Sequence, residues 1–194
     1  CGTVKALITG STGFVGANLC AALAARNWDV RALHRAASRL DALQGVEVEH
    51  VIGDVTAPEI LVNAMRGCDV VFHVAAVADY WRQSVDKLYR VNIEGTRAVC
   101  QAALEAKVRR LVFTSSAASL GVPRSGQLAD ESHEFNLPPE RFRYGHSKLL
   151  AEGVVREYIA RGLEAVIVNP AVILGPGDLN LISGSLVVEM ACRR

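Results

Sequence analysis

Residues 9–16 read TGSTGFVG, and this stretch decides the fold because of what lies on either side of it. The apolar residues 4–8 precede it as a buried strand would, and residues 14–26 follow as an amphipathic helix. Glycines three residues apart allow a tight turn and a close approach of backbone to ligand. The N–H groups at the start of such a helix attract phosphate. The stretch therefore predicts a strand–turn–helix unit that binds a dinucleotide pyrophosphate, with the spacing G-x-x-G-x-x-G.

Composition limits the classes to which the chain can belong. Its 194 residues are 51% hydrophobic and 21% charged, which predicts one folded domain with a full core. A net charge of +1 without a basic block argues against nucleic-acid binding. Apolar runs end well before the roughly 18 residues of a membrane span, so no membrane association is expected.

Cysteine usage and the first residues indicate the compartment. The five cysteines are scattered and form no C-x-x-C pair, so we expect free thiols and no metal site. No signal peptide is visible, because the first residues lead directly into a strand. Both observations favour a cytoplasmic protein.

Short aliphatic runs alternate with helical periods along the chain, which is typical of a doubly wound parallel sheet, the Rossmann fold. Strands are expected at 4–9, 29–34, 46–52, 69–74, 109–114 and 164–169. Helices are expected at 14–26, 58–66, 84–106 and 146–161, with further helical patterns at 36–44 and 180–192. Thr56 is expected to cap the second helix, and Asn27, Gly67 and Gly162 to end helices.

Two connections suggest where a ligand binds. The loop over residues 121–143 is unusually long for a compact domain, and residues 175–178 read GPGD after the last strand. Both follow strands that should end at the same edge of the sheet, outside which ligands bind in this fold.

Tyr144 and Lys148 stand four residues apart and therefore share one face of a helix. A phenol has a pKa of about 10, which a neighbouring ammonium lowers, so the pair makes a usable proton donor or acceptor. A hydroxyl that polarises a carbonyl would complete such a site, and the TSS sequence at 114–116 supplies one at the end of a strand.

These motifs resemble the extended branch of the short-chain dehydrogenase/reductase superfamily, in family order and over nearly the whole chain. The matching elements are TGSTGFVG at 9–16, GDV at 53–55, HVAA at 73–76, NIEGT at 92–96, TSSA at 114–117, the Tyr144-x-x-x-Lys148 pair and NP at 169–170. Within the family, the strand ends look most like the dihydroflavonol-reductase-like group, which reduces ketones or aldehydes with NADPH.

The resemblance implies a role for each matching residue. Tyr144 would be the general acid/base, Lys148 would lower its pKa, and Asn92 would support the site. Ser116 would be the active-site serine, with Ser115 as the alternative if the register slips by one residue. The implied cofactor-binding residues are Gly10, Thr12, Gly13, Phe14, Val15, Gly16, Arg35, Asp54, Val55, Ala75, Ala76, Val77, Tyr144, Lys148, Pro170, Val172 and Ile173.

The end of the second strand discriminates between the two nicotinamide cofactors. An NAD enzyme would place a carboxylate there for the ribose 2′-hydroxyl, whereas this chain has Arg35 and no acid before Asp41. Arginine pairs with phosphate, so NADP(H) is favoured and NAD(H) remains possible.

Several functions stay open. The leading one is an NADP(H)-dependent oxidoreductase acting on a small carbonyl substrate. An NAD-dependent sugar-nucleotide epimerase would use the same residues, and a non-catalytic NADP-binding redox sensor would not need them. Dehydration is disfavoured because Ala117 and Ala118 replace the acid pair that it requires. By resemblance, helices 84–106 and 146–161 would pair two copies into a homodimer.

For the remaining candidate residues, a purely structural interpretation stands beside the functional one. His73 is expected to be a structural histidine, and His146 to point away from Tyr144 and Lys148. His34 is expected to be solvated. Tyr80 and Trp81 form either a wall over the substrate or a packing cluster.

The chain is expected to hold an NAD(P)-binding domain at 1–174 and the start of a truncated substrate-binding lobe at 175–194. Members of the family continue into a larger lobe, so the apolar helix that ends near Met190 would be left exposed. The expected consequence is tight NADPH binding with little or no turnover by these residues alone.

Overall fold

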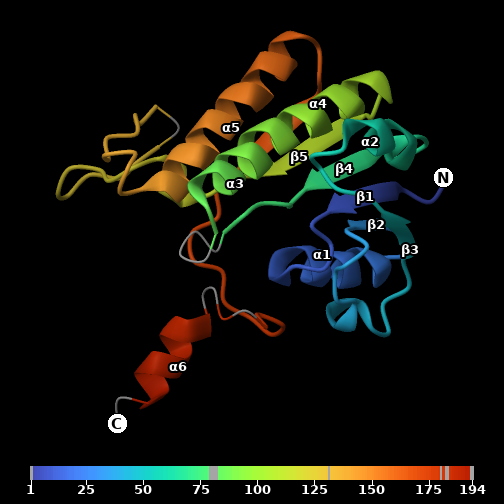
Figure 1. Ribbon diagram of the computed structural model, residues 1–194, viewed down its shortest axis with the longest axis horizontal. Helices are drawn as coiled ribbons and strands as arrows, with labels where there is room; N and C mark the ends of the chain where they lie inside the picture. The colour runs from blue at the N-terminus through green and yellow to red at the C-terminus, as the bar shows by residue number, and fades with distance from the viewer. Residues whose placement is uncertain (1, 79–82, 131, 180, 182–183, 193–194) are drawn as a thin grey trace.

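The computed structural model describes residues 2–78, 83–130, 132–179, 181 and 184–192. Within them, six parallel strands form one sheet in the order β3-β2-β1-β4-β5-β6 (Figure 1). The strands are β1 (Lys5–Thr9), β2 (Asp29–His34), β3 (Glu49–Ile52), β4 (Val70–His73), β5 (Arg110–Thr114) and β6 (Ala165–Val168). The order reverses between β1 and β4, so a crevice forms at their carboxyl ends. The predicted doubly wound sheet is confirmed.

Helices cover both faces of this sheet (Figure 1). On one face lies α1 (Phe14–Ala24), and on the other lie α2 (Pro58–Met65), α4 (Gly95–Glu105) and α5 (Arg143–Ala160). Successive side chains of β1 point to opposite faces of the sheet: Ala6 and Ile8 pack with α1, and Leu7 packs with α2, α4 and α5. Burial on both faces is why the strands read as continuous apolar runs.

The helix predicted at 84–106 is one helical run with a wider turn inside it. It consists of α3 (Val85–Tyr89), the π-helical segment η2 (Arg90–Glu94) and α4. Such π turns occur mostly at functional sites. Here the wider turn carries Asn92, which is 2% exposed.

Two local predictions were wrong. The pattern at 36–44 forms only the short turn η1 (Asp41–Leu43), because just one of its apolar residues, Leu43, is fully buried and a helix needs a packed face. Thr56 does not cap α2, since its N–H and Oγ1 both donate to Asp54 Oδ1 at 2.9 Å and Ala57 takes the cap position. The helix exits are confirmed: Asn27, Gly67 and Gly162 have φ of 59°, 73° and 97°.

The last helix, α6 (Gly184–Cys192), extends away from the sheet and its covering helices (Figure 1). Val187, Val188 and Met190 are 48%, 47% and 63% exposed, which confirms an exposed apolar helix. None of the described helices has the length and apolar character to cross a membrane. The domain boundary at 174 and the homodimer remain predictions.

Candidate active site at the carboxyl edge of the sheet

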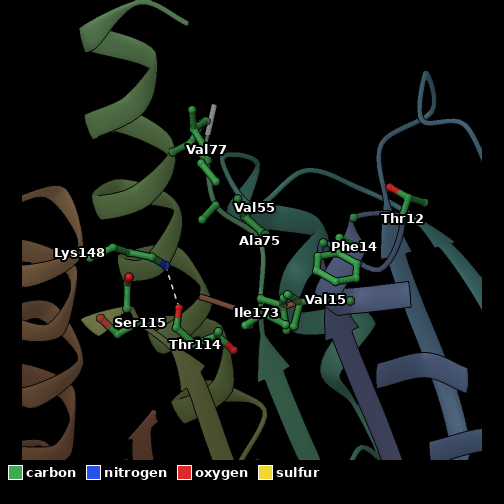
Figure 2. Close-up of a pocket in the computed structure, with 18 of the residues that line it drawn as sticks. Thr12, Phe14, Val15, Val55, Ala75, Val77, Thr114, Ser115, Lys148 and Ile173 are labelled. Atoms are coloured by element: carbon green, nitrogen blue, oxygen red, sulfur yellow. Dashed lines mark hydrogen bonds between the residues drawn. The ribbon is translucent and has the colours of Figure 1, made fainter. Parts of the chain in front are cut away.

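A cavity of about 830 Å³ opens where β1 and β4 end, and it gathers nearly every residue that the sequence singled out (Figure 2). Its lining includes Gly10, Thr12, Gly13, Phe14, Val15, Gly16, Arg35, Asp54, Val55, Ala75, Ala76, Val77, Ser116, Tyr144, Lys148, Pro170, Val172 and Ile173. Asn92 lies behind the lining, and Tyr80 and Trp81 lie outside the described residues. The roles of these residues in binding and catalysis remain predictions.

The phosphate turn, residues 10–16, leaves no room for a side chain at Gly10 or at Gly16. Gly10 has φ of 69°, and a Cβ on it would stand 2.7 Å from the Cα of Ala75. A Cβ on Gly16 would overlap the carbonyl of Gly10, to which the N–H of Gly13 donates at 3.0 Å. The bare backbone beside the N-terminus of α1 suits a pyrophosphate, so the turn fits a dinucleotide.

The cavity continues to the end of β2, where Arg35, Ser38 and Asp54 line it. The neighbouring Arg39 is turned to Asp41 instead, with Nε and Oδ2 2.9 Å apart. Residues 34–40 hold no carboxylate that could accept from a ribose 2′-hydroxyl, and Arg35 lines this end of the cavity. The preference for NADP(H) over NAD(H) stays a prediction.

The expectation that His34 is solvated was wrong. It is 8% exposed, and its Nε2 lies 3.2 Å from Nδ1 of His50 on the neighbouring strand β3. Parallel pairing sets the two residues on adjacent strands, and the sequence alone gave no sign of that partnership.

Tyr144 stands in the first turn of α5, which begins at Arg143, three residues before the predicted start. Lys148 follows one turn later and is 3% exposed. Its Nζ donates to the carbonyl of Thr114 at 2.7 Å and lies 4.9 Å from the centre of the Phe113 ring (Figure 2). Burial lowers the pKa of Lys148 to about 8, and the charge of Glu152 acts in the opposite direction.

The structure distinguishes the two candidate serines. Ser115 is 3% exposed, and its Oγ donates to Glu152 Oε1 at 2.5 Å. Ser116 accepts the N–H of Ala118 at 3.2 Å at the start of η3 (Ala117–Ser119). Because the hydroxyl hydrogen of Ser115 is already committed, Ser116 is the better donor for a ligand.

Glu152 is a buried carboxylate that sequence reasoning missed. Besides Ser115, it accepts from Ser119 Oγ and Asn169 Nδ2 at 2.7 Å each and pairs with Arg156 at 3.1 Å. Asn169 also donates to the carbonyl of Ser116 at 3.2 Å. This network joins α5 to the ends of β5 and β6. A signal was present, since Glu152 follows Lys148 by four residues on the same helix face.

Asn92 supports the cavity wall from behind. Its Oδ1 accepts from the N–H of Val77 at 2.8 Å, and its Nδ2 donates to the Val77 carbonyl at 3.2 Å and to Ser147 Oγ at 3.0 Å. The amide therefore fixes the backbone of a lining residue to α5, and its role in support of catalysis stays a prediction.

The two histidines near the site have structural partners. His73 is fully buried between the hydroxyls of Thr9 and Thr96, which confirms its structural reading. The Nδ1 of His146 lies 2.9 Å from the hydroxyl of Tyr89 on α3. Among the described residues, no group of three or more His, Cys, Asp or Glu is placed to hold a metal ion.

Several proteins of known sequence or structure are similar to this chain. A Synechocystis sp. protein with the provisional name dihydroflavonol 4-reductase is 42% identical over 172 residues, 89% of this chain and 50% of the relative. The crystal structure of gox2253 matches with a TM-score of 0.86 and 34% identity, over 96% of this chain and 57% of that one. UDP-glucose 4-epimerase from Brucella ovis, in complex with NAD, matches with a TM-score of 0.75 and 27% identity, over 86% and 51%.

The chain thus spans about half the length of these relatives. A sequence model of the NAD dependent epimerase/dehydratase family matches residues 6–193, nearly the whole chain. With the sheet order, the glycine turn and the Tyr144–Lys148 pair, this match confirms the resemblance drawn from the motifs. The chain belongs to the NAD dependent epimerase/dehydratase family, within the extended short-chain dehydrogenase/reductases.

Proposed function

We propose that the protein is an NADP(H)-dependent oxidoreductase that reduces a ketone or aldehyde of a small organic substrate, or oxidises the corresponding alcohol. One observation carries the proposal: Ser116, Tyr144 and Lys148 line the same cavity as the phosphate turn and Arg35. The name of the Synechocystis relative, a reductase, supports the same reaction class.

The chemistry follows from these side chains. The hydroxyls of Ser116 and Tyr144 donate hydrogen bonds to the carbonyl oxygen of the substrate, which makes its carbon more electrophilic. When bound, the reduced nicotinamide supplies the hydride to that carbon. Tyr144 gives its proton to the oxygen, and the ammonium of Lys148 stabilises the phenolate that remains.

The residues for the cofactor are distributed along the cavity. The backbone of the phosphate turn would hold the pyrophosphate, and Arg35 would pair with the 2′-phosphate. Ala75, Ala76 and Val77 line the cavity and would supply an apolar wall beside the cofactor.

The competing function is epimerisation of a nucleotide sugar with NAD, which the likeness to the NAD-bound Brucella enzyme favours. Calorimetric titration of the chain with NADPH and NADH separates the two. We expect NADPH to bind at least tenfold more tightly. A tenfold preference for NADH would overturn the Arg35 argument and favour the epimerase.

A non-catalytic redox sensor is the third possibility, and Tyr144→Phe tests it. The substitution removes only the hydroxyl, so we expect cofactor affinity to change less than about twofold. Carbonyl reduction, measured in a protein that also carries the larger substrate-binding lobe, should fall by about 10²- to 10⁴-fold. Full activity in this variant would contradict the catalytic role of Tyr144.

A further inference from the structure

His73 ends β4 deep in the molecule and connects two hydroxyl groups. It is 0% exposed, its Nδ1 lies 2.8 Å from Thr9 Oγ1, and its Nε2 lies 3.0 Å from Thr96 Oγ1. Thr9 precedes the phosphate turn, and Thr96 stands on α4 one turn after Asn92. The imidazole therefore lies between the cofactor turn and the helical run that supports the cavity wall.

The direction of these hydrogen bonds follows from counting donors at Thr9. Its Oγ1 accepts the N–H groups of Val74 and Ala75, each at 3.2 Å. A hydroxyl has two acceptor positions and one hydrogen, so the hydrogen must point to Nδ1 of His73. Nδ1 is consequently an acceptor and carries no proton.

The other side of the ring gives the same answer. A neutral imidazole without a proton on Nδ1 carries it on Nε2, which donates to Thr96 Oγ1. The hydroxyl hydrogen of Thr96 is then directed to the carbonyl of Asn92, 2.6 Å away. Every donor in the series Thr9–His73–Thr96 points the same way, so each bond polarises the next.

A second proton on the ring would break this series, because Nδ1–H would meet an oxygen whose lone pairs are already used. Burial and the charge of Lys148 lower the pKa of His73 to about 3, in agreement with a ring that stays neutral. The geometry thus admits one tautomer.

The series continues on both sides into the site. Thr9 Oγ1 accepts from the N–H groups of Val74 and Ala75. The backbone of Ala75 packs directly against Gly10 of the turn, since a Cβ on Gly10 would stand 2.7 Å from the Cα of Ala75. At the far end, the Asn92 side chain donates to Ser147 Oγ, and that hydroxyl donates to the carbonyl of Tyr144 at 2.7 Å. One buried path therefore joins the phosphate turn to the first turn of α5.

We propose that His73, fixed as the Nε2–H tautomer, is a positioning residue that couples the phosphate turn to the helix of Tyr144 and Lys148. Ordering of the turn by the cofactor is transmitted along Thr9, His73 and Thr96 to the segment that holds the proton donor. This inference rests on the proposed function for its cofactor, but the tautomer is a property of the chain by itself.

The first test is nitrogen NMR of the unmodified chain labelled with ¹⁵N-histidine. We expect one ring with a protonated Nε2 and a bare Nδ1, unchanged between about pH 5 and pH 8 because the pKa lies far below this range. All five histidines are assigned by single substitution to Asn. A protonated Nδ1 on His73, or titration of its ring near pH 6.5, would overturn the proposal.

The second test is Thr96→Val, which removes the hydroxyl while keeping the shape. Thr96 does not line the cavity, so an effect on the cofactor must be transmitted. We expect NADPH to bind about five- to tenfold more weakly, since a buried N–H and a carbonyl lose their partner. Thr96→Ser should restore the affinity.

Val99→Ala is the matched control, since Val99 is equally buried on α4 but belongs to the apolar core. We expect it to lower stability and leave NADPH affinity unchanged. Wild-type affinity in Thr96→Val, or equal weakening in Val99→Ala, would overturn the coupling. If the wild-type chain bound no nicotinamide dinucleotide, the proposed function would fail while the NMR measurement still decided the tautomer.

Discussion

Lys148 on α5 donates from Nζ to the carbonyl oxygen of Thr114 at the end of β5, 2.7 Å away. The bond fixes α5 to the sheet, and it takes a charged group out of water to do so. Burial of a charge in this way destabilises the folded state.

The burial of Lys148 predicts a stability that rises with pH. The folded pKa is about 8 and the ordinary value is 10.5, so between these values the unfolded chain binds more protons than the folded one. From pH 7 to 10.5 we expect the free energy of unfolding of the wild type to rise by about 3 kcal/mol relative to that of Lys148→Met. Urea unfolding at each pH measures this difference, and a constant difference would contradict the buried charge.

Arg35→Ser tests the choice of cofactor. Loss of a charge-assisted bond to the 2′-phosphate should weaken NADPH binding by about ten- to hundredfold and leave NADH binding unchanged. Arg39→Ser is the matched control, because Arg39 is 86% exposed and paired with Asp41. Calorimetric titration of the wild type and the two variants with NADPH and NADH measures the affinities. Equal losses of NADPH affinity in both variants would indicate a general effect of surface charge.

Two glycine-to-alanine changes should act in opposite directions. In Gly16→Ala the new Cβ meets the backbone of Gly10, so we expect the free energy of unfolding to fall by about 2 kcal/mol or more and cofactor binding to be lost. In Gly153→Ala the Cβ enters open space on α5, so we expect a gain of about 0.5–1 kcal/mol. Thermal unfolding compares them. A stable Gly16→Ala protein that binds NADPH would contradict the close packing of the turn.

Glu152→Gln tests the network behind Ser116. The amide keeps one oxygen for three donors and turns its NH₂ toward Arg156, so we expect about 2 kcal/mol of destabilisation. Glu157→Gln, on the same helix, is 52% exposed beside Arg97 and should cost less than about 0.5 kcal/mol. Urea unfolding measures both, and similar values for the two would show that burial of Glu152 contributes nothing.

Local features of the chain were predictable because their physical cause is local. Glycine spacing and the change from strand to helical period gave the turn at residues 9–16 and the sheet around it. Tyr144 and Lys148 share a helix face through spacing alone. The pattern at 36–44 predicted a helix that does not form, since only Leu43 of its apolar residues is buried and a helix needs a whole packed face.

The sequence by itself determined the family, the order of the elements and the residues at the carboxyl edge, because each depends on neighbours within a few positions. Only the tertiary structure decided how those residues are held. His73 meets Thr9 across 64 positions, and Glu152 meets Ser115 across 37. Burial deprives such polar groups of water, so their partners are chosen by which strands and helices become adjacent in space.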